Sequence, residues 1–299
     1  PYRFFWGNSF QIGTKMALAV LLVTLGTSYV LLNISSSLFQ ARNFFGPKYV
    51  ADRPNGHQTM RTLIQGLTNH GGQIISDPAA RKLPVTYYGP NSGVGKVFAF
   101  QQTRSPKKAL RVAIIGLGGG GLAAYCRPTD EFTFFEIDPQ VVKIAYQYFD
   151  YLKRCPRSSV SVIDGRLGLE ERLRDPTHQK YDLIIIDAYA DDLMPVHLLT
   201  AEAIAVYRSL LALEGVLLTH ISSRYLNMDR VIAAYAGDGW HGRLYEDATA
   251  VFPYQRSLWG VFSRTEDLFA HAPLDTGTKL PHQPVFWTDT SSALLPILR

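Results

Sequence analysis

A glycine-rich segment, residues 114–125 (IIGLGGGGLAAY), sets the strongest limit on how this chain can fold. Within it, Gly116, Gly118 and Gly121 have the spacing G-x-G-x-x-G. The motif comes directly after a predicted strand and at the start of a predicted helix, which is the context that gives this spacing its meaning. Glycine permits a tight turn and lets a ligand approach the main chain and the amino end of a helix.

A regular alternation of strands and helices surrounds and follows this segment. The strands are continuous apolar runs, typical of strands covered on both faces, and are predicted at 111–116, 132–138, 160–165, 181–187 and 215–221. Helices are predicted from Pro139, with Asp138 as N-cap, to about 151, at about 166–174 and at about 200–213. The pattern predicts an α/β fold with a doubly wound parallel sheet.

Acidic residues end two of the predicted strands near the glycine loop. Glu136 lies twenty residues beyond Gly116, where a carboxylate can accept both hydroxyls of a ribose. Asp164 ends the third strand, on the same edge of the sheet. These positions predict a nucleoside pocket at the switch point of the sheet. The alternative is that the glycines only permit tight packing and that the acids cap helices.

Residues after the fourth and fifth predicted strands indicate whether the ligand is NAD or an S-adenosyl compound. Asp187 ends the fourth strand, where S-adenosyl-dependent enzymes commonly place a group that faces the reacting centre. Residues 241–263 are predicted to form a terminal antiparallel hairpin, which suits a methyltransferase-like sheet better than a dehydrogenase. The sequence therefore favours an S-adenosyl ligand over NAD, on a Rossmann-like fold of the class I methyltransferase type.

The N-terminal segment, 1–40, differs from the rest of the chain in composition. No charged residue occurs between Lys15 and Arg42, and a helix through this run, at about 1.5 Å per residue, can cross the roughly 30 Å hydrocarbon core of a bilayer. We predict one transmembrane helix at about 12–34 and a single-pass membrane localisation. A cleaved signal peptide and a buried core helix are the alternatives. A weak excess of basic residues after the run places the catalytic-type domain on the cytoplasmic side.

Three further segments complete the predicted organisation. Residues 41–107 contain short β-branched and aromatic runs punctuated by Gly, Pro and Asn, which indicates a small β-rich subdomain of hairpins. Residues 108–271 form the Rossmann-like S-adenosyl-binding domain, and 272–299 form a C-terminal tail that packs on it.

Charge and cysteine content narrow the range of partners. The net charge is +5, but the basic residues are scattered, so no nucleic-acid partner is expected and an anionic membrane lipid surface fits better. Cys126 and Cys155 lack metal-ligand spacing, no His/Cys/Asp cluster has it, and no metal is expected. We interpret the two cysteines as buried structural thiols, which fits a reducing compartment or ordinary packing.

Taken together, the motifs resemble the spermidine synthase-like family. The resemblance covers roughly 41–295 and rests on GLGGGGLAAY, FFEIDP, VIDGR, YDLIIIDAYADDLMPVHLLT, THISSRYL and WTD, with RNFFG, TLIQGLTNHGGQ and YYGPNSGVG in the β subdomain. It is greatest to the membrane-fused subgroup, in which such a domain follows transmembrane helices. The resemblance implies an enzyme of polyamine biosynthesis, a transferase whose donor substrate is S-adenosylmethionine or its decarboxylated form.

The resemblance also implies roles for particular residues. The glycine loop, 116–121, lies at the amino-acid or aminopropyl portion of the donor, Glu136 at the ribose, and Asp164 with Gly165 near the adenine. Asp187 is the implied carboxylate that aligns the attacking amine and accepts its proton, and Asp192 is the second catalytic candidate.

The acceptor side departs from the family's pattern. The acids Asp187, Asp191 and Asp192 are spaced differently from the family's Asp-x-x-Asp, and around Tyr88 the carboxylate of the family's Tyr-His-Glu is missing, so putrescine is a doubtful acceptor. His220, at the end of the fifth strand, is interpreted as a partner of the neighbouring loop in preference to a catalytic group. The candidates for the substrate pocket are His70, Gln73, Tyr88, Asp191 and His197.

The sequence thus predicts aminopropyl transfer to an amine by a membrane-anchored protein. The first alternative is methyl transfer to a membrane-associated acceptor. The second is a non-catalytic scaffold subunit of a membrane protein complex. The expected partners are a small-molecule amine or membrane-associated acceptor, membrane lipid, and a membrane protein complex or a second copy of the chain.

Overall fold

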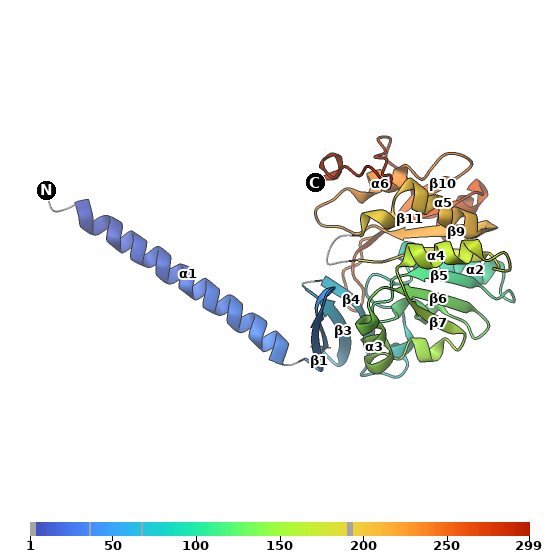
Figure 1. Ribbon diagram of the computed structural model, residues 1–299. Helices are drawn as coiled ribbons and strands as arrows, with labels where there is room; N and C mark the ends of the chain where they lie inside the picture. The colour runs from blue at the N-terminus through green and yellow to red at the C-terminus, as the bar shows by residue number, and fades with distance from the viewer. Residues whose placement is uncertain (1–3, 36, 67, 190–193) are drawn as a thin grey trace.

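Two β-sheets with their covering helices form the body of the protein, and one long helix projects from it (Figure 1). The computed structural model describes residues 4–35, 37–66, 68–189 and 194–299, with only the backbone described at 4–11 and 29–35. Asp191 and Asp192, predicted as pocket and catalytic residues, lie outside the described residues.

Helix α1 (Phe4–Ser35) contains the apolar run for which a transmembrane helix was predicted at about 12–34. Across the residues that the structure describes, no helix has the length and apolar character that crossing a bilayer requires. The structure therefore does not support the predicted span, nor the single-pass membrane localisation inferred from it.

The smaller sheet is an antiparallel meander of four strands, β1 (Phe39–Asn43), β2 (Gly46–Asn55), β3 (Gln58–Gln65) and β4 (Thr68–Ile74). A two-residue turn at 56–57 joins β2 to β3, and Gly56 adopts φ +58° there, a conformation that glycine takes without strain. The hairpins predicted for this region are present. Residues 93–104, however, form a helix, α2 (Gly93–Arg104), which the prediction of a β-rich subdomain did not include.

The larger sheet is mixed, with the strand order β12-β10-β11-β9-β8-β5-β6-β7. Its parallel part comprises β5 (Arg111–Ile115), β6 (Glu131–Glu136), β7 (Ser158–Val162), β8 (Tyr181–Ile186) and β9 (Leu211–His220). The predicted terminal hairpin is present as β10 (His241–Asp247) and β11 (Ser257–Ser263), and β12 (Thr278–Lys279) pairs with β10. The Rossmann-like prediction is confirmed, and the chain reverses its strand order between β5 and β8.

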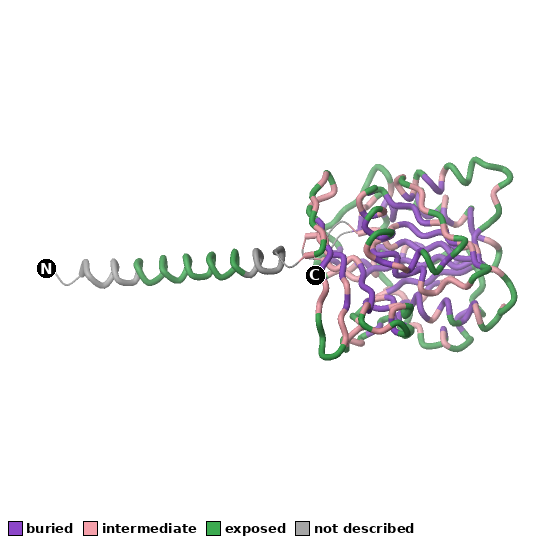
Figure 2. The backbone as a smooth tube through the Cα atoms, turned by 90° about the horizontal axis from the view of Figure 1, so that it is seen from below, coloured by how far each residue is buried: buried purple, intermediate pink, exposed green. Residues whose placement is uncertain are grey.

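Helices cover both faces of the parallel strands, as the continuous apolar runs predict (Figure 2). On one face, alternate residues of β5 such as Val112 and Ile114 pack with α2 and α3 (Pro139–Tyr148). On the other, Ala113 and Ile115 pack with α4 (Gly165–Arg174), α5 (Ala201–Leu210) and α6 (Met228–Ala233). The predicted cap of α3 is confirmed, because the Asp138 carboxylate accepts the Gln140 N–H at 2.8 Å with Pro139 in the first turn.

Cys126 and Cys155 are joined in a disulfide, with 5.6 Å between their Cα atoms. The prediction of two separate structural thiols was therefore wrong. Spacing does not reveal such a pair, because the two cysteines are 29 residues apart and meet only once β6 and α3 have folded between them. Disulfides persist in oxidising compartments, which counts against the reducing compartment inferred from the sequence.

Reduction of this disulfide is expected to lower the free energy of unfolding by about 3 kcal/mol, since the bond closes a chain loop of intermediate length. Urea denaturation with and without reductant measures the change. The double variant Cys126→Ala/Cys155→Ala should be less stable and insensitive to reductant. Equal midpoints for the oxidised and reduced protein would show that the bond contributes nothing.

Candidate functional site

The protein's own main chain comes close to two of the motif glycines. Gly116 and Gly118 have φ values of +97° and +54°. A Cβ on Gly116 would lie 2.3 Å from the carbonyl oxygen of Asp187, and one on Gly118 would lie 2.2 Å from that of His70. The glycines therefore let β8 and the smaller sheet approach the loop after β5, which is the packing role weighed as the alternative to ligand contact.

The loop does not lead into an α-helix as predicted. Gly121–Tyr125 form a five-residue 3₁₀-helix, and a Cβ on Gly121 would lie 2.9 Å from the ring of Tyr88. Such a short element offers little of the helix-terminus field that the motif usually provides for an anion. The loop is half-buried at Gly116 and Gly118 and buried from Gly119 to Gly121, so recognition there depends on these two half-buried glycines and on neighbouring side chains.

A cavity of about 200 Å³ lies at the carboxyl ends of β5, β6 and β8. Eight of the predicted site residues are brought together in its lining: His70, Gly116, Gly118, Glu136, Asp164, Gly165, Asp187 and His197. Apolar side chains from both sheets close it, among them Leu63 and Phe135. The cavity sits at the reversal of strand order, where open α/β sheets bind their ligands. We call it the donor cavity.

Glu136 is buried at the wall of the donor cavity and is held by the main chain. One carboxylate oxygen accepts the Leu117 N–H at 3.0 Å and the other accepts the Asp138 N–H at 2.9 Å. Burial raises the pKa of Glu136 to about 7, against the two hydrogen bonds, which lower it. The carboxylate is fixed in orientation and retains lone pairs for a ligand hydroxyl.

Asp164 caps α4, accepting the Leu167 N–H at 3.0 Å, and its other oxygen lies 2.8 Å from Nε2 of His197. Burial opposes ionisation of Asp164, but the hydrogen bonds from His197 and from Leu167 N–H outweigh it and lower the pKa of the carboxyl. His197 lies in the donor cavity and not in the second cavity described below, so the structure does not support its predicted place facing the acceptor.

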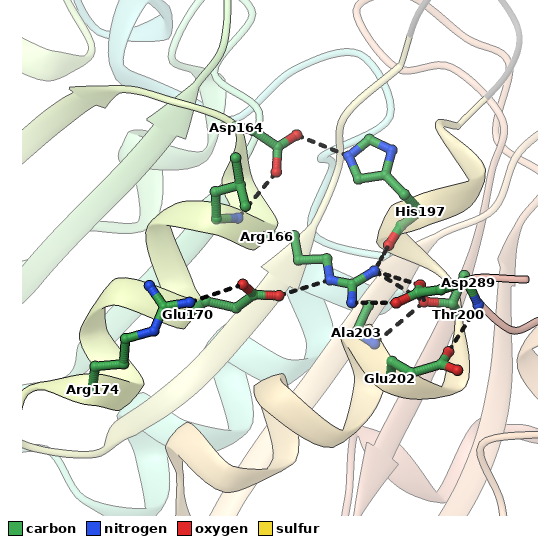
Figure 3. Close-up of polar contacts among 10 residues, drawn as sticks. Asp164, Arg166, Glu170, Arg174, His197, Thr200, Glu202, Ala203 and Asp289 are labelled. Carbon is green, nitrogen blue, oxygen red and sulfur yellow. Dashed lines mark hydrogen bonds and ion pairs between the residues drawn. The ribbon is translucent and has the colours of Figure 1, made fainter.

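A network around Arg166 fixes this end of the donor cavity (Figure 3). The Arg166 guanidinium binds both carboxylate oxygens of Asp289, at 2.6 and 2.7 Å, and donates to the carbonyl of His197 at 3.2 Å. Thr200 donates to Asp289 at 2.8 Å. The C-terminal segment and the turn that carries His197 are thereby tied to α4.

A second cavity, of about 380 Å³, adjoins the first. The two share His70, Gly118, Asp187 and Tyr189. The second cavity is otherwise polar and aromatic, and its further lining residues are Thr68, Asn69, Tyr87, Tyr88, His220, Ser222, Arg224 and Gln255. Asp187 therefore stands between the two cavities. We call the second one the acceptor cavity.

Asp187 is almost fully buried and is bonded on both carboxylate oxygens. Tyr88 donates its hydroxyl to one oxygen at 2.5 Å, and Nδ1 of His220 lies 2.7 Å from the other. The pKa of Tyr88 is raised well above its usual range by burial and by the nearby Asp187 carboxylate. Tyr88 thus stays a neutral donor. The structure places this predicted residue in the acceptor cavity, in contact with Asp187.

Gln73 lies in neither cavity. Its amide donates to the Arg81 carbonyl at 2.9 Å and to Asp150, and it accepts the Asp150 N–H at 3.2 Å. It joins β4 to the chain after α3, a structural position, so its predicted place in the substrate pocket is not supported. His70, predicted as a substrate-pocket residue, does line both cavities.

Sequence reasoning undervalued His220 and overlooked Ser222 and Tyr87. Nε2 of His220 lies 2.8 Å from the Ser222 hydroxyl, and its ring stacks on Tyr87 and Trp259 at centroid distances of 4.9 and 4.5 Å. The polar run after β9, THISS, was the available signal, because the carboxyl ends of parallel strands gather at one edge. As to metals, the described residues contain no group of three or more His, Cys, Asp or Glu placed to hold an ion.

No family model matches the chain. It is 34% identical over 131 residues to a polyamine aminopropyltransferase of Vibrio vulnificus, a match that spans 43% of each chain. It is also 36% identical over 95 residues to an eEF1A lysine and N-terminal methyltransferase homolog of Drosophila pseudoobscura pseudoobscura, over 30% of this chain and 14% of that protein. The matches thus span less than half the length of these two curated relatives.

Solved structures show the same fold over most of the chain. The spermidine synthase of Thermotoga maritima superposes with a TM-score of 0.52 at 14% identity, covering 85% of this chain and 82% of that one. A probable spermidine synthase of Corynebacterium glutamicum gives 0.54 at 15% identity, with 76% and 80% covered. The comparisons do not bear on the membrane-fused subgroup. The chain is thus similar in sequence, over less than half its length, to polyamine aminopropyltransferases, and it has the fold of spermidine synthases over most of its length.

Proposed function

We propose that the chain is a transferase that binds S-adenosylmethionine or its decarboxylated form in the donor cavity and passes an aminopropyl group to an amine in the acceptor cavity. The observation that carries the proposal is the meeting of the two cavities at Asp187, Gly118 and His70. A reacting carbon of the donor placed there can be approached by a nucleophile from the acceptor cavity, as displacement at a carbon beside a sulfonium requires.

The donor cavity has the groups that an S-adenosyl compound needs. Glu136 presents a fixed carboxylate for the ribose hydroxyls, and Asp164 with Gly165, which follow the neighbouring strand β7, line the part of the cavity proposed for the adenine. The half-buried main chain at Gly116 and Gly118 is proposed to lie on the sulfonium side, next to Asp187. The relatives named as polyamine aminopropyltransferases favour the decarboxylated donor.

Methyl transfer is the second candidate, and the acceptor cavity supplies the reason. Among its described lining residues Asp187 is the one carboxylate, so the cavity offers a single negative charge to a polyamine dication. Curated relatives include methyltransferases, which use the carboxylated donor. The identity of the donor therefore separates the two candidates.

Titration calorimetry with S-adenosylmethionine, decarboxylated S-adenosylmethionine and methylthioadenosine tests the proposal. Preference for the decarboxylated compound supports aminopropyl transfer, and preference for S-adenosylmethionine supports methyl transfer. Glu136→Ala should weaken donor binding by about 1–3 kcal/mol because a charged partner of the ribose is lost. Glu131→Ala, at the other end of β6, is the matched control. Failure of all three compounds to bind would refute the transferase and favour a scaffold.

Donor binding is expected to weaken as the pH falls below about 7. Burial raises the pKa of Glu136 to about 7, so the free protein holds this carboxyl protonated at lower pH, whereas the ribose hydroxyls bind the ionised form. Binding then releases a proton, and the Kd should rise by up to about tenfold per pH unit below that value. Calorimetry in buffers of different ionisation enthalpy measures the proton. The variant Glu136→Gln should bind with no such dependence, and an unchanged pH profile in this variant would contradict the assignment.

A further inference from the structure

The hydrogen bonds of Asp187 define the protonation state of the groups around it. Tyr88 and His220 both approach its carboxylate, at 2.5 and 2.7 Å. Transfer of a proton from an acceptor molecule to this carboxylate would weaken the hydrogen bonds that it accepts from two buried groups. The carboxylate is well placed to hold a histidine in one orientation and one tautomer.

The partners of His220 fix that tautomer. The Asp187 carboxylate can only accept, so in the neutral imidazole of His220 the hydrogen lies on Nδ1 and Nε2 is the acceptor. The Ser222 hydroxyl, 2.8 Å from Nε2, must then donate to it. The Ser222 oxygen also accepts the Leu258 N–H at 2.9 Å, which is compatible with a hydroxyl hydrogen that points at Nε2.

The array is held by packing around His220, and Ser222 lies between Nε2 of His220 and the acceptor cavity that both residues line. The His220 ring lies between Tyr87 and Trp259, with interplanar angles of 28° and 14°, and its side chain is 6% exposed. Ser222, which is half-buried, lines the acceptor cavity beside Tyr87 and Tyr88. The hydroxyl is therefore the point at which a bound acceptor meets the histidine.

We propose that Ser222 and His220 form a proton relay for the acceptor, with Asp187 as a positioning residue that acts through His220. This inference rests on the proposed transfer reaction and names its base. It also narrows the acceptor to a molecule that carries a hydrogen on its nucleophilic nitrogen or oxygen and that binds as a neutral group.

The step balances as follows. The nucleophilic atom of the acceptor forms a bond to the donor carbon, the bond from that carbon to the sulfonium sulfur breaks, and its electron pair stays on sulfur as a neutral thioether. The acceptor's proton moves to the Ser222 oxygen while the hydroxyl hydrogen of Ser222 moves to Nε2 of His220. The resulting imidazolium is paired with the Asp187 carboxylate.

The tautomer of His220 tests the relay without any substrate. Nitrogen NMR of the full chain labelled with ¹⁵N-histidine, with His220 assigned by the signal lost in His220→Gln, should show hydrogen on Nδ1. Hydrogen on Nε2 would overturn the relay, because Ser222 could not then donate. In Asp187→Asn, the Tyr88 hydroxyl should donate to the new amide oxygen, which turns the amide nitrogen toward His220. The amide N–H then donates to Nδ1, and the ring hydrogen of His220 should move to Nε2. A folded Asp187→Asn protein with an unchanged tautomer would also overturn it.

Turnover provides the second readout, measured as methylthioadenosine release from the decarboxylated donor with primary amines. Ser222→Ala and His220→Gln should each lower kcat by about a hundredfold or more, while calorimetry shows donor binding retained. Ser257→Ala, which removes a buried hydroxyl without a partner among the described residues, should leave kcat unchanged. Full turnover in Ser222→Ala would refute the relay alone. If the unaltered protein does not bind the donor, the proposed transferase is itself refuted.

Discussion

The variant Gly118→Ala should lose about 3 kcal/mol or more of folding stability and lose donor binding. An added Cβ would lie 2.2 Å from the carbonyl oxygen of His70, closer than packed atoms approach. That carbonyl cannot easily retreat, because it belongs to β4 and accepts the Gly119 N–H at 3.2 Å. Overpacking of this kind typically costs 1–3 kcal/mol, and a non-glycine residue at φ +54° adds about 1–2 kcal/mol.

Gly56→Ala is the matched control for this experiment. Gly56 has φ +58°, nearly the same as Gly118, but nothing lies within 4 Å of its added Cβ. Urea denaturation of the two variants therefore separates the clash from the backbone strain. If Gly118→Ala costs no more than Gly56→Ala, the contact between the glycine loop and β4 is not a rigid part of the site.

The position of the glycine loop followed from the sequence, but the reason for its glycines did not. The spacing after an apolar strand placed the loop at the edge of the sheet, where Gly116 and Gly118 line the donor cavity. Which atoms approach each glycine depends on the smaller sheet and on β8, and these contacts are long-range. Glycines at this spacing therefore both line the cavity and allow close packing beneath it.

Helix α2 shows where local pattern fails for the fold. Its sequence, GVGKVFAFQQTR, begins with glycine and β-branched residues, which favour a strand or turn over a helix. In the structure a Cβ on Gly93 would lie 2.5 Å from the Cβ of Trp259, and one on Gly95 would lie 2.4 Å from the carbonyl oxygen of Gly89. The glycines allow close packing of the helix, so tertiary contact outweighs propensity here.

The acids of the site were predictable and their partners were not. Glu136, Asp164 and Asp187 were found because they end parallel strands, whose carboxyl ends meet at one edge. The pairing of Asp187 with His220 depends on the register of β8 and β9, in which Ile186 lies opposite Thr219. Hydrophobic patterning does not specify that register between two fully apolar strands, so the relay could be recognised only from the structure.

The variant Lys48→Met should cost about 3–5 kcal/mol of folding stability, because it leaves a buried carboxylate without its cation. The Lys48 ammonium lies 2.6 Å from Asp138, and the two side chains are 0% and 3% exposed. The ammonium also donates to Asn43 at 2.9 Å, and Asn43 in turn donates to Asp138 at 2.8 Å. The pair joins β2 to the cap of α3 at the wall of the donor cavity, so donor affinity should fall with stability.

Urea denaturation of a small set of variants tests this assignment. In Lys48→Met/Asp138→Asn neither charge of the pair is left buried, and the amide oxygen at 138 can still accept from the Gln140 N–H and from the Asn43 amide, so part of the lost stability should return. Arg104→Met is the matched control, because Arg104 pairs with Glu214 at the surface, with 44% and 64% of the side chains exposed, and such pairs contribute about 0–1 kcal/mol. If Lys48→Met loses no more folding stability than Arg104→Met, then water reaches Asp138. The contact between the two sheets would in that case not depend on charge.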